Sequence, residues 1–164
     1  LAVSAAVAEF TGLSPVVKWP NDVRIGERKV SGILVEAVVE AGELRHAVVG
    51  LGVNVNFDPS LFPEIASTAT SLFKETGRRL GRTAVLLAIL KRLDDRYRAV
   101  RAGESLTARW SAQLETLGKA VQVRWGDQVI EGRAIDVDDQ GNLEVLKADG
   151  STVMVVAGEV SSQA

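Results

Sequence analysis

The clearest pattern in the chain is a pair of alternating hydrophobic runs joined by a short turn. In the run Val30–Glu40, apolar residues recur at every second position, which predicts a β-strand. Ala41-Gly42-Glu43 is suited to a tight turn, and Leu44–Asn56 alternates again. We therefore expect a β-hairpin, with Leu44–Asn56 as its return strand.

One face of the predicted return strand changes character toward its end. Gly50, Gly52, Asn54 and Asn56 all fall on that face. Glycines leave room above a sheet, and the amides that follow project into that room. This combination is typical of a ligand site and unusual for a plain core. The alternative is a β-bulge followed by surface amides.

Helical periodicity appears in four further segments. Leu1–Thr11 and Thr70–Glu75 each precede a glycine that would end the helix, and Glu104–Glu115 predicts another short helix. The longest predicted helix starts at the N-cap candidate Thr83 and runs to about residue 100. Its apolar side chains follow helical spacing and should form the buried face: Leu86, Ile89, Leu90, Leu93, Tyr97 and Val100.

The sequence changes texture after Leu117-Gly118. Four short strand-like runs follow, separated by glycine-containing turns: Val121–Trp125, Gln128–Ile135, Leu143–Leu146 and Thr152–Val156. Short strands joined by tight turns are typical of a small barrel. We therefore predict a first domain over residues 1–116 and a barrel over residues 117–164.

Composition excludes several classes of function. The 164 residues are 46% hydrophobic and 24% charged, as in an ordinary globular protein. A net charge of -2 argues against a dedicated nucleic-acid binder. The absence of cysteine excludes thiolate metal sites and cysteine nucleophiles. No apolar run reaches the roughly 20 residues that span a bilayer, so we expect no membrane partner. The absence of cysteine is compatible with a reducing cytosol, and we expect a cytoplasmic protein.

Two short motifs carry candidate chemistry. Lys18-Trp19-Pro20-Asn21-Asp22 would form a rigid corner that holds an amide and a carboxylate, although the same residues also suit a plain turn. Lys29 opens an otherwise apolar strand, and Gly32 leaves a gap three residues later. A lysine beside such a gap can hold an anion whose chain passes over the glycine. The alternative for Lys29 is a solvated lysine at a strand start.

The order and spacing of Lys18–Asp22, Lys29–Glu36 and Gly50–Asn54 resemble the biotin protein ligase family. That family shows a basic-Trp-Pro-Asn-Asp corner, a Lys-x-x-Gly-Ile-Leu-x-Glu strand and a Gly-x-Gly-x-Asn strand. The likeness continues through Ala69-Thr70-Ser71-Leu72 to Gly158-Glu159. It implies an α+β fold: part of a mixed sheet with helices, like that of class II aminoacyl-tRNA synthetases, followed by an SH3-like barrel.

The resemblance also implies roles for individual residues. It makes Lys29 the catalytic residue, in contact with the biotin carboxylate and the α-phosphate, and gives the biotin chain room over Gly32. It implies a biotin and adenylate site formed by Trp19, Asn21, Asp22, Lys29, Gly32 and Leu34, and nucleotide contacts from Gly52, Asn54 and Asn56. The segment Phe57–Thr70 would correspond to a loop that orders over the adenine.

The implied activity is that of a biotin–[acetyl-CoA-carboxylase] ligase. Such an enzyme uses ATP and Mg²⁺ to form biotinyl-5'-AMP and transfers biotin to a lysine of a biotin carboxyl carrier protein domain. A homodimer is possible, and no nucleic acid is expected to bind through this chain. Some family members carry an arginine after the final strand, where this chain has Ser161-Ser162-Gln163.

Family members also carry a Gly-Arg-Gly-Arg-rich loop before the first helix, and these 164 residues lack it. We therefore expect the chain to be a fragment that forms the adenylate poorly by itself. Two alternatives stay open. Lipoate-type ligases share the implied fold, and only those with a cysteine nucleophile are excluded. The missing loop also allows a degenerate, non-catalytic binding module.

Overall fold

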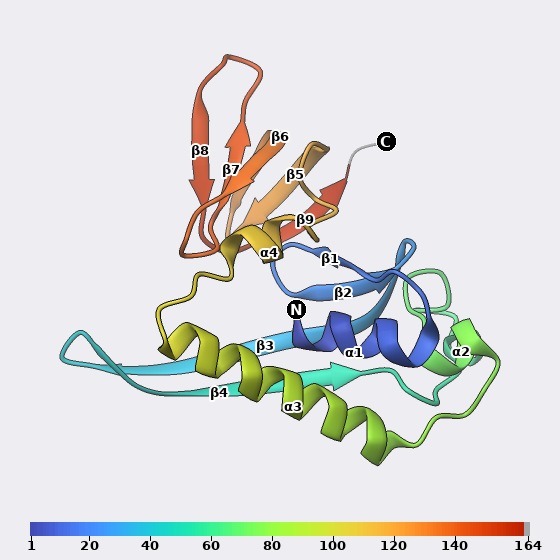
Figure 1. Cartoon of the computed structure of the whole chain (residues 1–164). Coiled ribbons are helices and arrows are strands. Elements are labelled where there is room, and N and C mark those ends of the chain that lie inside the picture. Colours follow the sequence, from blue (N-terminus) through green and yellow to red (C-terminus); the bar gives the residue numbers. More distant parts are fainter. Residues whose placement is uncertain (163–164) are drawn as a thin grey trace. The chain divides into compact units, whose positions relative to one another are not determined.

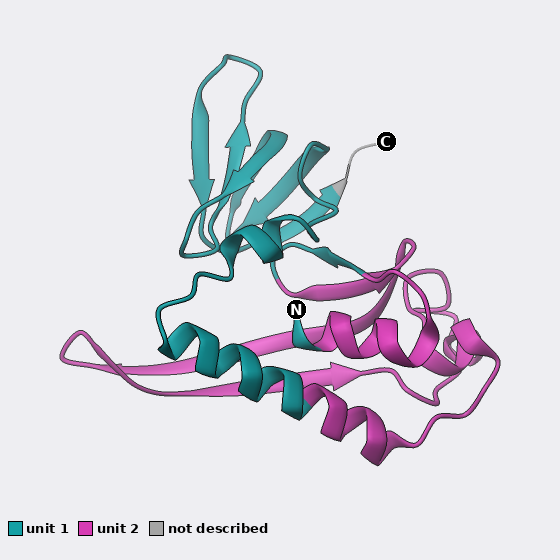
Figure 2. Cartoon of the chain, in the orientation of Figure 1, with its two compact units in different colours: residues 1–2, 16–20, 90–164 teal, residues 3–15, 21–89 magenta. Residues whose placement is uncertain are grey.

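The computed structural model describes residues 1–162, so Gln163 of the C-terminal tail lies outside the described residues. The chain divides into two compact units, shown in different colours in Figure 2. Unit 2 comprises residues 3–15 and 21–89, and unit 1 comprises residues 1–2, 16–20 and those from 90 onward. The predicted α+β class is confirmed.

Unit 2 is built around the predicted hairpin. The strands β2 (Asp22–Ile25), β3 (Arg28–Glu40) and β4 (Glu43–Val53) pair in antiparallel order (Figure 1). Ala41 and Gly42 both have positive φ, 52° and 82°, which matches the right-handed twist of two-residue hairpin turns. The strand β2 escaped the sequence analysis because it is short and follows turn-forming residues.

Three helical segments complete unit 2 together with the start of the long helix. They are α1 (Ala2–Thr11), the 3-10 turn η1 (Pro59–Leu61) and α2 (Leu72–Thr76). Ser71 caps α2 by accepting a hydrogen bond from the Lys74 backbone N–H at 3.0 Å, and Gly77 ends it with φ 68°. The predicted helix at Thr70–Glu75 is therefore confirmed with a slightly later start.

The long helix α3 (Arg82–Arg101) is confirmed, but its predicted buried face is wrong. Only Val85 and Ile89 are buried, whereas all the predicted stripe except Ile89 is at least a third exposed. The helix is apolar on two adjacent faces, and the pair Val85 and Ile89 packs into the unit 2 core. No helix among the described residues is long and apolar enough to cross a membrane.

Unit 1 contains the predicted short strands. They form an antiparallel sheet in the order β8-β7-β6-β5-β9, with bounds β5 (Ala120–Trp125), β6 (Gln128–Val137), β7 (Leu143–Leu146), β8 (Thr152–Val155) and β9 (Glu159–Ser162). The hydrophobic pattern did not predict the last strand, because Gly158 interrupts it just before. The family resemblance did imply a final strand at Gly158-Glu159, and the structure extends it through Ser162. The predicted helix at Glu104–Glu115 is shorter, α4 (Thr107–Ser111). The boundary near residue 117 stays a prediction.

The first strand, β1 (Val16–Lys18), and the residue after it belong to unit 1. The backbone of Val17 exchanges hydrogen bonds with the backbone of Gln113 and Glu115. Trp19 is 1% exposed and packs in the unit 1 core. Its indole N–H donates to the Gly141 carbonyl at 2.9 Å, and its backbone N–H donates to Thr116 Oγ1 at 3.0 Å. Trp19 therefore anchors the corner from inside a core.

This anchor predicts two graded stability losses. Trp19→Phe keeps an aromatic ring but leaves the Gly141 carbonyl unpaired, which should cost about 1–3 kcal/mol of unfolding free energy. Trp19→Ala also opens a cavity and should cost about 3–5 kcal/mol. Denaturant unfolding of the three proteins measures both. Losses below about 1 kcal/mol for both variants would contradict a core role for Trp19.

Candidate functional site

A β-bulge decides where Lys29 points. Across the β2–β3 pair, Val23 faces Ser31 but Arg24 faces Lys29, so β3 contains one extra residue at Val30. An extra residue of this kind turns the side chains beyond it to the other face of the sheet. It brings Lys29 to the face that carries Asp22, and Lys29 Nζ lies 2.6 Å from Asp22 Oδ1.

Gly32 provides the space that the Lys29 side chain occupies. Asp22 pairs with Gly32 across β2–β3, and Gly32 pairs with Gly52 across β3–β4. A Cβ added at Gly32 would lie 2.9 Å from Lys29 Nζ and 3.0 Å from Lys29 Cε. Any larger residue at this position would therefore push the ammonium group out of its place. Gly52 is different, because a Cβ there would meet only the Gly32 carbonyl oxygen, at 3.8 Å.

Asn21 ties the corner to the same strand. Its side-chain Nδ2 donates to the Ile33 carbonyl at 2.7 Å, and its backbone carbonyl accepts from the Ile33 N–H at 3.0 Å. These two hydrogen bonds clamp the residue before Asp22 against β3. The geometry fixes the Asp22 carboxylate next to Lys29, which keeps a partly exposed ammonium group paired and oriented.

These residues surround a hollow of about 490 Å³ on unit 2. Its lining includes five of the predicted site residues, Asn21, Lys29, Gly32, Leu34 and Gly52, together with Ile33, Gly50 and Leu51. Leu34 is 62% exposed and presents an apolar surface there. The hollow thus combines a positively charged side chain, an apolar surface and the open space that glycines leave.

Asn54 and Asn56 follow the glycines at the end of β4 and are both held in place. Asn54 Nδ2 donates to the Thr70 carbonyl at 3.0 Å. Asn56 makes two bonds to the backbone of Leu80, donating to its carbonyl at 2.8 Å and accepting from its N–H at 2.9 Å. Both residues line a second hollow of about 430 Å³, also on unit 2.

The segment Phe57–Thr70 is joined to Lys29 through the backbone. The Lys29 N–H donates to the Thr68 carbonyl, and the Thr70 N–H donates to the Lys29 carbonyl, both at 2.8 Å. At the other end, Asp58 accepts from the side chain and backbone of Ser60 and lies 3.6 Å from Lys74 Nζ. These Ser60 hydrogen bonds, with Lys74, hold the pKa of Asp58 below its ordinary value.

Two predicted site residues, Trp19 and Asp22, line neither hollow, but Asp22 still contacts Lys29, which lines the first hollow, whereas Trp19 serves a core. Its ring is buried in the unit 1 core and does not line either hollow. The sequence pattern could not separate the two roles, because a tryptophan in a polar corner suits a ligand contact as well as an anchor.

Sequence reasoning also missed Arg79 and Arg82, which line the second hollow, and Glu75. The Glu75 carboxylate accepts from Arg28 Nη2 at 2.7 Å and from Thr70 Oγ1. The sequence did contain a hint of these arginines, because a basic run around Arg78 lies in the loop between two helices. Glu75 gave no signal beyond an ordinary helical glutamate.

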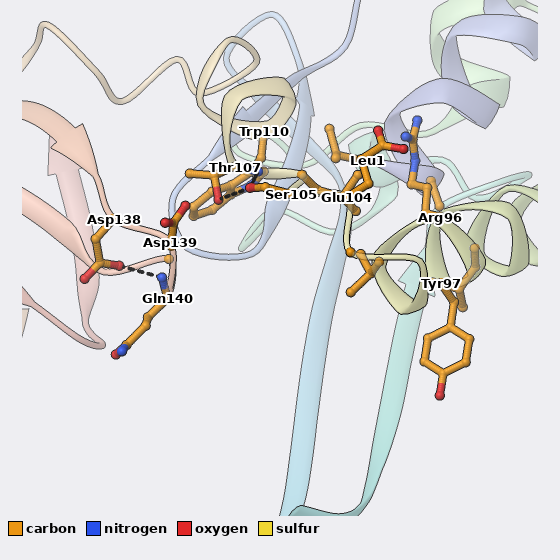
Figure 3. Close-up of a pocket in the computed structure, with 16 residues that line it drawn as sticks. Leu1, Arg96, Tyr97, Glu104, Ser105, Thr107, Trp110, Asp138, Asp139 and Gln140 are labelled. Carbon is orange, nitrogen blue, oxygen red and sulfur yellow. Dashed lines mark hydrogen bonds between the residues drawn. The ribbon is translucent and has the colours of Figure 1, made fainter.

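A larger cavity, of about 800 Å³, lies elsewhere, on unit 1 (Figure 3). Its lining includes Tyr97, Glu104, Trp110 and Asp139, but none of the predicted site residues. We place the candidate site at the two smaller hollows because the cation, the amides and the glycines converge there. Among residues 1–162, no group of three or more His, Cys, Asp or Glu side chains could hold a metal ion.

Comparisons with known proteins identify the relatives of this chain. The family model described as "Biotin/lipoate A/B protein ligase family" matches residues 2–54, and the one described as "Biotin protein ligase C terminal domain" matches residues 116–162. The bifunctional ligase/repressor BirA of Bacillus subtilis is 32% identical over 92% of the chain and 47% of its own length. The biotin--[acetyl-CoA-carboxylase] ligase of Mycobacterium tuberculosis is 36% identical over 98% of the chain and 59% of its own length. The chain thus spans about half the length of these relatives.

Solved structures give the same result. The biotin protein ligase of Aquifex aeolicus superposes with a TM-score of 0.83 at 31% identity, covering 99% of this chain and 70% of that one. The same ligase in complex with biotin and ATP gives a TM-score of 0.82 at 31% identity, covering 99% of this chain and 67% of that one. With that identity and coverage added to the two family models, the chain belongs to the biotin protein ligase family.

Proposed function

We propose that the chain is the C-terminal part of an ATP-dependent biotin ligase, which forms biotinyl-5'-AMP and transfers biotin to a lysine of a carrier protein domain. One observation carries this proposal: a lysine held by a carboxylate directly over a glycine gap, at the edge of a hollow with an apolar floor. A biotin ligase needs that arrangement, because its substrate has an apolar chain that ends in a carboxylate.

The proposed reaction has two displacement steps. In the first, a biotin carboxylate oxygen bonds to the α-phosphorus of ATP, and the bond from that phosphorus to the bridging oxygen of the β-phosphate breaks, which releases pyrophosphate. In the second, the carrier lysine nitrogen bonds to the biotin carbonyl carbon. The carbon–oxygen bond to AMP then breaks, AMP leaves, and the amine loses a proton.

Lys29 supplies charge in the first step. Two anions must approach each other there, and an ammonium between them offsets their repulsion as negative charge moves toward the phosphate. Asp22 holds Lys29 before the substrate arrives, and the incoming carboxylate and phosphate then replace that partner. Gly32 and Leu34 accept the biotin chain, and Asn21 keeps the corner in place.

The nucleotide binds beside the C-terminal end of β4, next to the biotin site. Gly52 gives it room, Asn54 and Asn56 border it, and the segment Phe57–Thr70 covers the adenine. Mg²⁺, when bound, would be held mainly by phosphate oxygens of the nucleotide and would supply positive charge that offsets theirs, because this ion is usually bound through phosphate oxygens and one or two carboxylates. Trp19 contributes from inside its core, by holding the corner that precedes Asn21.

The proposal is tested by biotin-dependent exchange of pyrophosphate into ATP, which reports adenylate formation alone. We expect exchange by the longest natural form of the protein that contains these residues, and little or none by the 164-residue chain, which has no Gly-Arg-Gly-Arg sequence. Exchange that needs lipoate instead of biotin would overturn the substrate assignment. Robust exchange by the 164 residues alone would show that the Arg-rich loop is dispensable.

Lys29 is the residue whose loss should affect chemistry most. Lys29→Ala should change the unfolding free energy by less than about 0.5 kcal/mol, because the side chain is half-exposed, and should slow single-turnover adenylate formation by about 100-fold. Lys29→Arg should restore the rate only partly, since a planar guanidinium cannot take the place of a compact ammonium between two close anions. Rates within twofold of wild type for Lys29→Ala would remove Lys29 from the site.

Gly32→Ala should separate catalysis from folding. The added methyl group meets only the flexible end of Lys29 within 3.0 Å, so the lysine can move away at little cost to stability. We expect less than about 1 kcal/mol of destabilisation but at least a tenfold slower adenylate formation, because the displaced ammonium no longer faces the reacting oxygens, roughly the effect of a small misplacement. Gly81→Ala is the control, since its Cβ would meet only Ala84 Cβ at 3.8 Å. Equal rates for the two variants would contradict the role given to Gly32.

A further inference from the structure

The second hollow on unit 2 carries charges that the proposed mechanism does not use. It holds about 430 Å³, and its lining brings Asn54, Asn56 and Phe57 together with Arg79 and Arg82, and also includes Val53 and Val55. The predicted return strand ends at Val53 in the structure, so Asn54 and Asn56 lie just beyond β4, whose Gly50 and Gly52 line the first hollow. The two hollows therefore follow one another along the chain.

Arg79 and Arg82 bring positive charge without a matching carboxylate. Among residues 1–162, neither guanidinium forms an ion pair with a carboxylate. The nearby carboxylates are engaged by other cations, Asp58 by Lys74 at 3.6 Å and Glu75 by Arg28 at 2.7 Å. Arg79 is instead placed over the ring of Phe73, 5.4 Å from its centroid. The hollow is thus left with two unneutralised cations.

The backbone of the segment that carries these arginines is held by hydrogen bonds to Asn56. Both amide atoms of Asn56 bond to the backbone of Leu80, at 2.8 and 2.9 Å, and Leu80 stands between Arg79 and Arg82 in the sequence. The stacking on Phe73 further restricts Arg79. Side chains held in this way lose less entropy when they bind a ligand. Guanidinium groups form paired hydrogen bonds to phosphate oxygens, which makes phosphate the matching ligand.

We propose that Arg79 and Arg82 form an anion subsite that holds phosphate groups of the bound nucleotide. This rests on the proposed function, since it assigns the second hollow to the nucleotide end of the ligand. The subsite places cationic charge beside the departing pyrophosphate in the second hollow, whereas the lysine that faces the biotin carboxylate lies in the first. Lys29 and the two arginines then act on different parts of the same reaction.

Calorimetric titration of the longest natural form of the protein with inorganic pyrophosphate tests the subsite directly. We expect Arg79→Gln and Arg82→Gln to weaken pyrophosphate binding by about tenfold each, and the double variant to weaken it further. Adenosine, which lacks phosphate, should bind all variants within twofold. Arg78→Gln is the matched control, because it removes the same charge from the residue next to Arg79. Arg78 donates to the Phe10 carbonyl and does not line the hollow.

Two results would overturn the subsite. One is unchanged pyrophosphate binding by the double variant, and the other is an equal loss for Arg78→Gln, which would indicate diffuse surface charge. Exchange measurements separate this from the proposed function. Adenylate formation with an unchanged KM for ATP in the double variant would remove the subsite and leave the ligase standing. Pyrophosphate binding that depends on both arginines, in a protein that makes no biotinyl adenylate, would support the subsite and reject the ligase.

Discussion

The site depends on one extra residue in one strand. Without the bulge at Val30, Lys29 and Gly32 would face opposite sides of the sheet, because side chains alternate along a regular strand. With the bulge, the ammonium of Lys29, the carboxylate of Asp22 and the gap at Gly32 meet on one face. The hollow, the loop that pairs with the Lys29 backbone and the proposed chemistry all follow from that local irregularity.

This arrangement does not serve stability. The side chains of Lys29 and Asp22 are 49% and 23% exposed, and ion pairs in such positions contribute about 0–1 kcal/mol at most. Glycines inside strands weaken them, since they cost backbone entropy and pack no side chain. A sequence that places Gly32, Gly50 and Gly52 around a half-exposed lysine therefore accepts a weaker sheet in return for open space beside a fixed positive charge.

The sequence pattern predicted those elements whose hydrophobic period is long or whose ends are marked by glycine, such as the β3–β4 hairpin, α1, α2 and the strands of unit 1. The pattern gave a wrong prediction where one sequence pattern is compatible with two structures. The helix α3 is apolar on adjacent faces, so periodicity selected a stripe containing Leu86 and Leu90, although Val85 and Ile89 are the buried pair. The resemblance to a family named Lys29 and Gly32, but only the register of β2 and β3 explains how residues three apart reach the same face.

The corner Lys18–Asp22 shows why neighbouring residues of one motif need different explanations. Trp19 is buried and hydrogen-bonded to residues about a hundred positions away, at Thr116 and Gly141. Asn21, two positions later, clamps the backbone of Ile33 at the rim of the hollow. Trp19 is therefore anchored in the core of unit 1, whereas the hydrogen bonds of Asn21 to Ile33 belong to unit 2. Within unit 2 these bonds hold the backbone that leads into Asp22, so the carboxylate beside Lys29 is positioned by its own unit, and the aromatic residue of the motif need not touch a ligand.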